Sequence, residues 1–142
     1  MSEEPVLLRF CTAWQQQRLD AALENVRDDV AYTMFIPRDV VPFGGETIGK
    51  AAMKDRLRTI LEQFEMLRFD ARDFRGSGSI ERVRVAYSFR HRVTGETIVG
   101  IMRLVVRTQD DLIAELKEYH DVEKVRAFMR LVAYKAAGCT LN

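Results

Sequence analysis

The feature that most constrains the fold is a run of three alternating segments separated by short polar turns. Apolar and polar side chains alternate over residues 80–93, again over 97–107, and a third time over 112–120. A period of two is typical of half-buried β-strands, because successive side chains point to opposite faces. The connections at 94–96 and 109–111 are polar and short enough for hairpins. This part of the chain therefore predicts an antiparallel meander.

The remaining segments predict helices and two more strands. Apolar residues recur every three or four positions, as on one helical face, over residues 5–17, 18–25, 49–64 and 121–132. β-branched and aromatic residues predict a strand over 30–36. Alternation predicts another strand over 66–74, with Leu67, Phe69 and Ala71 facing inward.

Proline and glycine interrupt the chain at residues 38–49, which contain Pro42, Gly44 and Gly45. Such residues favour turns, so we expect a loop that covers a site, with Phe43 as its lid. Residues 133–142 are expected to form a loose C-terminal tail, with a partly helical tail as the alternative.

The order of these elements predicts an α+β fold. At 142 residues the chain can bury one good core, so we expect a single domain spanning residues 1–142. Two helices, a strand, a long helix and a meander predict a cone-shaped curved sheet, antiparallel or mixed, wrapped around the long helix.

Charge and hydropathy exclude several partners. The 22 basic and 21 acidic residues are mixed along the chain, so no field of one sign is available to bind nucleic acid or an anionic membrane. No apolar run is long enough to cross a bilayer, and residues 1–5 are acidic where a secretory signal would be basic. We expect a cytoplasmic protein.

The two cysteines, Cys11 and Cys139, lie near opposite ends of the sequence. They lack the paired spacing of a zinc site, and two free thiols in a reducing compartment are expected, with a disulfide as the alternative. No metal site and no cofactor are predicted.

The last predicted strand carries the strongest functional signal. One of its faces begins apolar and ends with a carboxylate and an imidazole: Leu112, Ala114, Leu116, Glu118 and His120. The other face holds Ile113, Glu115, Lys117 and Tyr119. A carboxylate beside apolar walls needs a partner, a ligand or trapped water, so this face predicts a pocket.

Glu118 is the best candidate for proton transfer, with help from His120 and Tyr32. An apolar pocket would raise its pKa above the usual value of about 4.3 and suit it to acid–base work. The alternative is that Glu118 only pairs with His120, Arg103 or a tyrosine hydroxyl, and that His120 caps the following helix.

A hydrophobic small molecule is the expected ligand, since the candidate walls are apolar or aromatic. The predicted walls are Trp14, Met34, Phe43, Met53, Leu57, Tyr87, Phe89, Met102 and Leu116. Ordinary core packing is the alternative role for most of them.

Three stretches, Arg27–Tyr32, Ile48–Met53 and Leu116–Asp121, resemble the NTF2-like superfamily and its SnoaL-like group. That group includes polyketide cyclases, ketosteroid isomerase and limonene epoxide hydrolase, and the resemblance covers residues 5–132. It implies a cone-shaped, cystatin-like α+β barrel, an apolar pocket, a homodimer formed through the sheet, and either acid–base chemistry or plain binding.

Carried over by position, the epoxide hydrolases would place a water-activating tyrosine at Tyr32 and an aspartate at Glu118. Their Arg-x-Asp pair is replaced by residues 85–87, Val-Ala-Tyr, and their asparagine by Met34. The first strand also lacks the aspartate that would be the isomerase base.

Three functions therefore stay open. The first is a cofactor-independent isomerase, cyclase or hydrolase acting on a hydrophobic carbonyl or ring compound. The second is a non-catalytic ligand-binding or dimerisation module. The third is a structural partner whose exposed sheet face carries Arg90, Arg103 and Lys117.

Overall fold

The computed structural model describes residues 4–138. Its elements follow the order α1 (Val6–Gln15), α2 (Leu19–Leu23), β1 (Val26–Phe35), β2 (Gly45–Ile48), α3 (Lys50–Gln63), β3 (Phe64–Ser77), β4 (Ile80–His91), β5 (Thr97–Gln109), β6 (Leu112–Tyr119) and α4 (Val122–Ala136). The predicted α+β class is confirmed, and the three alternating segments form β4, β5 and β6.

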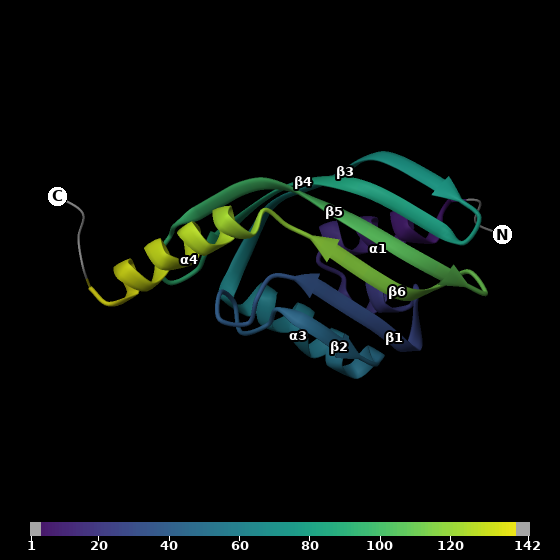
Figure 1. Ribbon diagram of the computed structural model, residues 1–142, viewed down its shortest axis with the longest axis horizontal. Coiled ribbons are helices and arrows are strands. Elements are labelled where there is room, and N and C mark those ends of the chain that lie inside the picture. The colour runs from purple at the N-terminus through teal and green to yellow at the C-terminus, as the bar shows by residue number, and fades with distance from the viewer. Residues whose placement is uncertain (1–3, 139–142) are drawn as a thin grey trace.

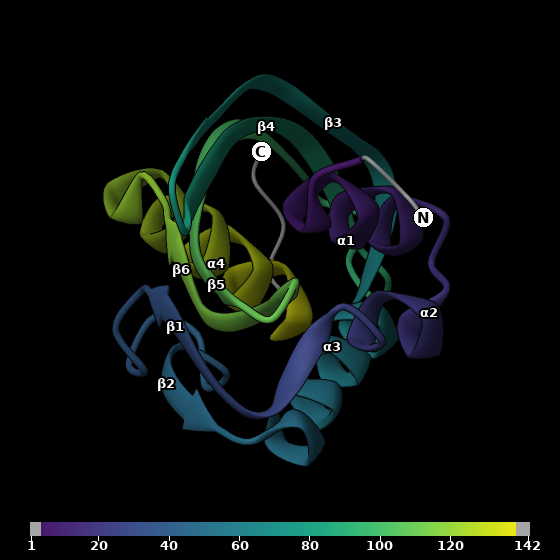
Figure 2. The same cartoon turned by 90° about the vertical axis from the view of Figure 1, so that its right-hand side faces the viewer.

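The strands form one mixed sheet in the order β2-β1-β6-β5-β4-β3. Strand β1 runs parallel to β6, and the other neighbouring pairs are antiparallel. The sheet curls from β3 round to β1 and β2, with α1, α2 and α3 along its open side (Figure 2). Helix α4 extends from one end of the sheet (Figure 1). The hydrophobic core therefore lies against the inner, concave face of the sheet.

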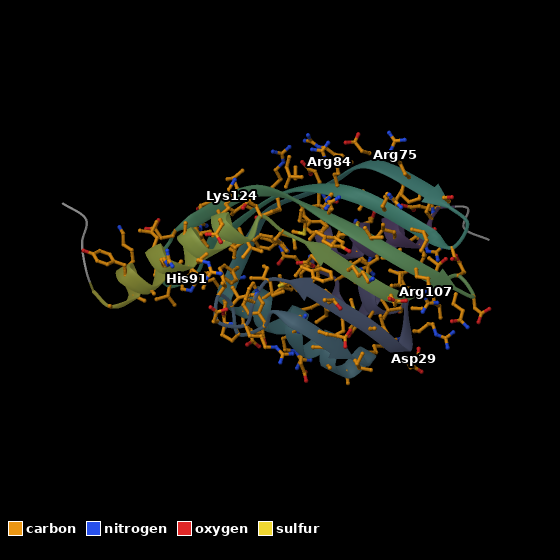
Figure 3. The ribbon with its side chains drawn as sticks, in the orientation of Figure 1. Asp29, Arg75, Arg84, His91, Arg107 and Lys124 are labelled. Atoms are coloured by element: carbon orange, nitrogen blue, oxygen red, sulfur yellow. The ribbon has the colours of Figure 1, made fainter. Side chains whose placement is uncertain are left out.

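The inner face of the central strands is the one that the alternation predicts. Val83, Val85 and Tyr87 of β4 are buried, as are Met102 and Leu104 of β5. On the outer face, Arg75 and Arg84 point away from the sheet (Figure 3).

Two bulges shift the alternation elsewhere. The pairing of β3 with β4 slips between Met66 and Arg68, so Leu67 is exposed although it was predicted to face inward. The pairing of β5 with β6 passes over Ala114, and Ile113 is completely buried although it was placed on the outer face. An extra residue in one strand reverses the facing of its neighbours.

Two boundaries also differ from the predictions. The stretch predicted as one loop contains the short strand β2, which pairs with β1. Helix α4 begins at an Asp121 cap, whose carboxylate accepts from the Lys124 amide at 3.2 Å, and it continues to Ala136. The tail expected from residue 133 is therefore helical over residues 133–136.

One of the two cysteines, Cys11, lies within the described residues and is a free thiol. Cys11 lies buried in α1, and burial raises the pKa of its thiol to about 12, which keeps it protonated. Cys139 lies outside the described residues.

Membrane crossing and metal binding can be assessed for the same part of the chain. Between residues 4 and 138, no helix has the length and apolar character needed to cross a bilayer. The same residues contain no group of three or more His, Cys, Asp or Glu side chains placed to hold a metal ion.

The loop between β1 and β2, residues 36–44, forms one wall of the interior, and we call it the wall loop. The two ends of the loop lie so close together that a Cβ atom added to Gly44 would clash with the Ile36 carbonyl oxygen. Only glycine avoids this clash with the backbone.

We expect Gly44→Ala to lower the free energy of unfolding by about 1–3 kcal/mol, because the loop backbone must shift to admit the methyl group. Chemical denaturation measures this change. Gly76→Ala is the matched control, since its added Cβ would make only van der Waals contacts, with the Phe74 ring at 3.4 Å and the Glu81 side chain at 4.0 Å. Equal stability of the two variants would contradict the prediction.

Candidate functional site

A cavity of about 100 Å³ lies within the curl of the sheet. It is lined by residues from α1, β1, the wall loop, α3, β3, β4, β5, β6 and α4, and most of them are apolar or aromatic. Apart from the Trp14 indole, the polar side chains in the lining are Tyr32, Tyr87, Glu118 and His120. The polar groups are therefore few and fixed in place.

All but one of the predicted wall residues line this cavity: Trp14, Met34, Phe43, Leu57, Tyr87, Phe89, Met102 and Leu116. Met53 is the exception. It is completely buried in α3, one turn before Leu57, and belongs to the core outside the cavity lining. Phe43 packs edge-on against Phe64 with ring centres 6.2 Å apart, so the predicted lid position is part of the wall.

Of the three residues predicted as catalytic, Tyr32 and His120 each contact Glu118. The Tyr32 hydroxyl donates to Glu118 Oε1 at 2.8 Å, and His120 Nε2 lies 2.5 Å from Glu118 Oε2. The exposed fractions of the Glu118 and His120 side chains are 12% and 7%. Both carboxylate oxygens are thus bound by protein groups in a nearly dry setting.

Strand register explains this meeting. Glu118 of β6 lies opposite Met34 of β1, and Leu116 lies opposite Tyr32. Side chains two residues apart share a face, and a tyrosine is long enough to reach its diagonal neighbour across a strand pair. The parallel β1–β6 pairing therefore brings Tyr32 to Glu118.

The alternative partners of Glu118 are now resolved. His120 and a tyrosine hydroxyl hold it, whereas the Arg103 guanidinium lies over the Tyr119 ring, 5.2 Å from its centre. The N-cap of α4 is Asp121, so His120 does not take the capping role. Glu118 therefore makes two of the contacts named in the alternative, in which it only pairs with neighbouring side chains.

The pKa of Glu118 is shifted in the direction opposite to the prediction. Burial alone would raise its pKa, but the charge and hydrogen bond of His120, the Tyr32 hydroxyl and the charge of Arg56 together lower it. The prediction of a raised pKa is wrong because it included the apolar walls without these partners. Glu118 is therefore ionised at neutral pH.

His120 has one ring nitrogen in use and one without a partner. Its Nδ1 atom is buried and has no hydrogen-bond partner among residues 4–138, while its ring packs edge-on to Tyr87 with centres 6.0 Å apart. His91, by contrast, lies at the end of β4 with its ring edge-on to Phe64, 5.4 Å between ring centres, and is absent from the cavity lining.

Tyr87 supplies a second hydroxyl to the cavity. Burial and the charges of Glu118 and Asp121 raise its pKa to about 12, so the phenol stays neutral and can donate. It lies opposite Gly100 of β5, where an added Cβ would come within 2.7 Å of the Tyr87 hydroxyl oxygen. The absence of a side chain at Gly100 makes room for this group.

Arg56 of α3 was not predicted as part of the site. It is 6% exposed, and its guanidinium carbon lies 4.9 Å from the centre of the Tyr32 ring. The signal was present, since Arg56 falls three residues after Met53 and one before Leu57, on the apolar face of α3.

The chain belongs to the SnoaL-like domain family, whose match covers residues 7–116. The fold is NTF2-like, the fold class that also contains ketosteroid isomerase-like proteins. The family match ends at Leu116, two residues before Glu118. Among curated proteins, none matches the chain significantly.

Several solved structures share the fold at low sequence identity. One is a protein from Rhodopseudomonas palustris that carries the provisional name isomerase. It has a TM-score of 0.77 and 20% sequence identity, and the match covers 96% of this chain and 99% of that protein. TerC, co-crystallised with polyporic acid, has a TM-score of 0.79 and 16% identity, with coverages of 88% and 95%. A ketosteroid isomerase-like protein from Catenulispora acidiphila, in complex with trimethylamine, has a TM-score of 0.75 and 14% identity, with coverages of 92% and 95%.

The lowered pKa of Glu118 predicts a pH-dependent contribution to stability. A carboxyl group whose pKa is lower in the folded state stabilises the fold above its unfolded pKa of about 4.3, and this stabilisation is lost as the pH falls through the folded pKa. We expect Glu118→Gln to cost about 1–3 kcal/mol at neutral pH, because a charged hydrogen-bond acceptor is lost. The cost should shrink on acidification.

Chemical denaturation of both proteins at a series of pH values measures this difference. The control is Glu81→Gln, which changes a carboxylate that accepts from the Leu7 amide at 3.0 Å, away from the cavity lining. A difference between wild type and Glu118→Gln that grows on acidification would contradict the assigned direction of the shift.

Proposed function

We propose that this protein binds a small hydrophobic compound with one carbonyl group and moves a proton on it, as isomerases and cyclases do, without a cofactor. The observation that carries this proposal is the ionised Glu118 carboxylate at the edge of an otherwise apolar cavity, held by Tyr32 and His120. The named roles of Glu118, His120 and Tyr32 are part of the proposal.

The proposed step is proton removal from the carbon next to the carbonyl. Glu118 accepts the proton, and the neutral Tyr87 hydroxyl donates to the carbonyl oxygen, where negative charge develops. Return of the proton from Glu118 to another carbon of the enolate restores the carbonyl group and completes an isomerisation. Tyr32 and His120 hold the carboxylate in place for both steps.

Cavity size supports a small ligand. A cavity of about 150 Å³ accommodates benzene, and this one measures about 100 Å³, so a probe should be no larger than a single five- or six-membered ring. The solved structures of TerC with polyporic acid and of the Catenulispora acidiphila protein with trimethylamine support small-molecule binding by this fold.

A second candidate is a ligand-binding module without catalysis. It is favoured by the saturation of Glu118, whose two oxygens already accept from Tyr32 and His120. Such a carboxylate needs no ligand to satisfy it, and its lowered pKa makes it a weaker base.

Hydrogen exchange on ketones separates the two candidates. We expect cyclopentanone, cyclohexanone or cyclohexenone to exchange α-protons in D₂O faster with the protein, as followed by proton NMR. Glu118→Gln should reduce this rate by about 10²–10⁴-fold, the usual contribution of general acid–base catalysis. Glu115→Gln, on the same strand but ion-paired with Arg107, should retain it.

Binding of the same ketones can be followed separately through Trp14, the one tryptophan of the chain, which lines the cavity. Fluorescence quenching without exchange for any ketone would favour the binding module. Exchange at equal rates in wild type and Glu118→Gln would refute the role of Glu118.

We also propose a homodimer formed through the outer face of the sheet. Val99 and Ile101 of β5 are 56% and 54% exposed there, and Phe35 stacks on Tyr119 with ring centres 4.6 Å apart. Exposed apolar surface of this kind is typical of an interaction site. Arg103, over the Tyr119 ring, borders the same area.

We expect Ile101→Glu to convert the dimer to a monomer, because two copies would bring like charges together in the interface. Analytical ultracentrifugation measures the mass in solution. Val93→Glu is the control, since Val93 is 83% exposed in the turn after β4 and outside this face. A monomeric wild type would exclude the proposed dimer.

A further inference from the structure

Arg56 is the one charged residue that is buried within the described part of the chain. A guanidinium removed from water is costly unless its donors are bonded. No carboxylate lies within ion-pair distance of Arg56 among residues 4–138, so its charge is met by other groups. Those groups indicate what the residue does.

The first set of partners belongs to the end of the wall loop and the start of β2. Arg56 Nη1 donates to the Gly45 carbonyl oxygen at 2.7 Å, and Nη2 donates to the Gly44 carbonyl oxygen at 3.1 Å. The wall loop contributes Ile36, Val41 and Phe43 to the cavity lining. One side chain of α3 therefore ties down the segment that closes one side of the cavity.

The second partner is the tyrosine that holds Glu118. The guanidinium lies over the Tyr32 ring at a distance typical of a cation–π contact, and the hydroxyl of the same ring donates to Glu118. The positive charge of Arg56 and the negative charge of Glu118 therefore favour each other across Tyr32.

We propose that Arg56 is a positioning residue that couples the wall loop to the Tyr32–Glu118 pair. If the loop moves outward, both hydrogen bonds from Arg56 to the carbonyl oxygens break, and the buried guanidinium loses these partners. The guanidinium must then shift away from Tyr32 as well. A closed wall and a correctly held carboxylate thus occur together. The catalytic consequence rests on the proposed role of Glu118, whereas the coupling itself does not.

The charged and titratable groups around this pair define the expected pH effect. Tyr32 on β1, Tyr87 on β4, His120 after β6 and Arg56 on α3 act on Glu118 or feel its charge, and Arg38 of the wall loop repels Arg56. Removal of the Arg56 charge takes away one of the influences that lower the pKa of Glu118. The carboxyl group should then titrate at higher pH.

Two substitutions separate the charge of Arg56 from the tether, by which we mean its two hydrogen bonds to the Gly44 and Gly45 carbonyl oxygens. Arg56→Met removes both, and Arg56→Lys keeps the charge but loses the planar fork that reaches two carbonyl groups. Arg58→Met is the matched control, because Arg58 lies on the exposed side of α3 and pairs with Asp55 at 3.7 Å. Circular dichroism first establishes that each variant is folded.

Two measurements follow on the folded proteins. Amide hydrogen exchange by mass spectrometry should accelerate about tenfold for peptides covering residues 36–48 in both Arg56 variants, as expected for easier local opening. Carboxyl ¹³C NMR should show the Glu118 titration moved to higher pH in Arg56→Met and close to wild type in Arg56→Lys. Arg58→Met should match wild type in both.

An unchanged loop exchange or an unchanged Glu118 titration in folded Arg56→Met would overturn the coupling. If Arg56→Met does not fold, the loop exchange of Arg56→Lys decides the tether, and protection equal to wild type overturns it. Neither readout needs a substrate. Failure of ketone exchange would therefore refute the proposed function while leaving this inference intact, and the reverse also holds.

Discussion

The structure depends on the need of a nearly dry carboxylate for hydrogen-bond donors. Glu118 lies at the edge of a cavity whose walls are mostly hydrocarbon, and a charge there is tolerated only if its oxygens are bonded. Tyr32 and His120 provide one donor each. They are available because β6 runs between β1 and β5 and because His120, directly after β6, packs edge-on to Tyr87 before α4 begins.

This arrangement extends beyond the immediate partners of Glu118. The ring that donates to the carboxylate is covered on one face by the Arg56 guanidinium, which is itself bound to two backbone carbonyl groups. A negative group, a phenol, a cation and a pair of carbonyl dipoles thus form one continuous polar chain through an apolar interior. In such a setting each member is costly to remove, because its neighbours lose a partner that water cannot replace.

Period-two alternation is the part of the sequence that predicted the site. It placed Glu118 and His120 on the inner face of the last strand. The register of β6 with β1 then brings Tyr32 to Glu118. Alternation fails where a bulge adds a residue, which is why Leu67 and Ile113 face the opposite way from the prediction. Arg56 was missed because an arginine on an apolar helical face is usually a surface residue. Its carbonyl partners come from a loop whose path no periodicity describes, and the direction of the Glu118 pKa shift depends on these same contacts.

The family match covers only part of the candidate site. The SnoaL-like match spans residues 7–116, which supply the first five strands and most of the cavity wall, and it ends before Glu118 and His120. A fold of this kind can house many reactions, because the sheet sets the shape and a few side chains set the reactivity. In this chain the two donors to Glu118 come from both sides of that boundary, Tyr32 inside the matched region and His120 beyond it. The carboxylate is therefore held by one donor from within the matched region and one from beyond it.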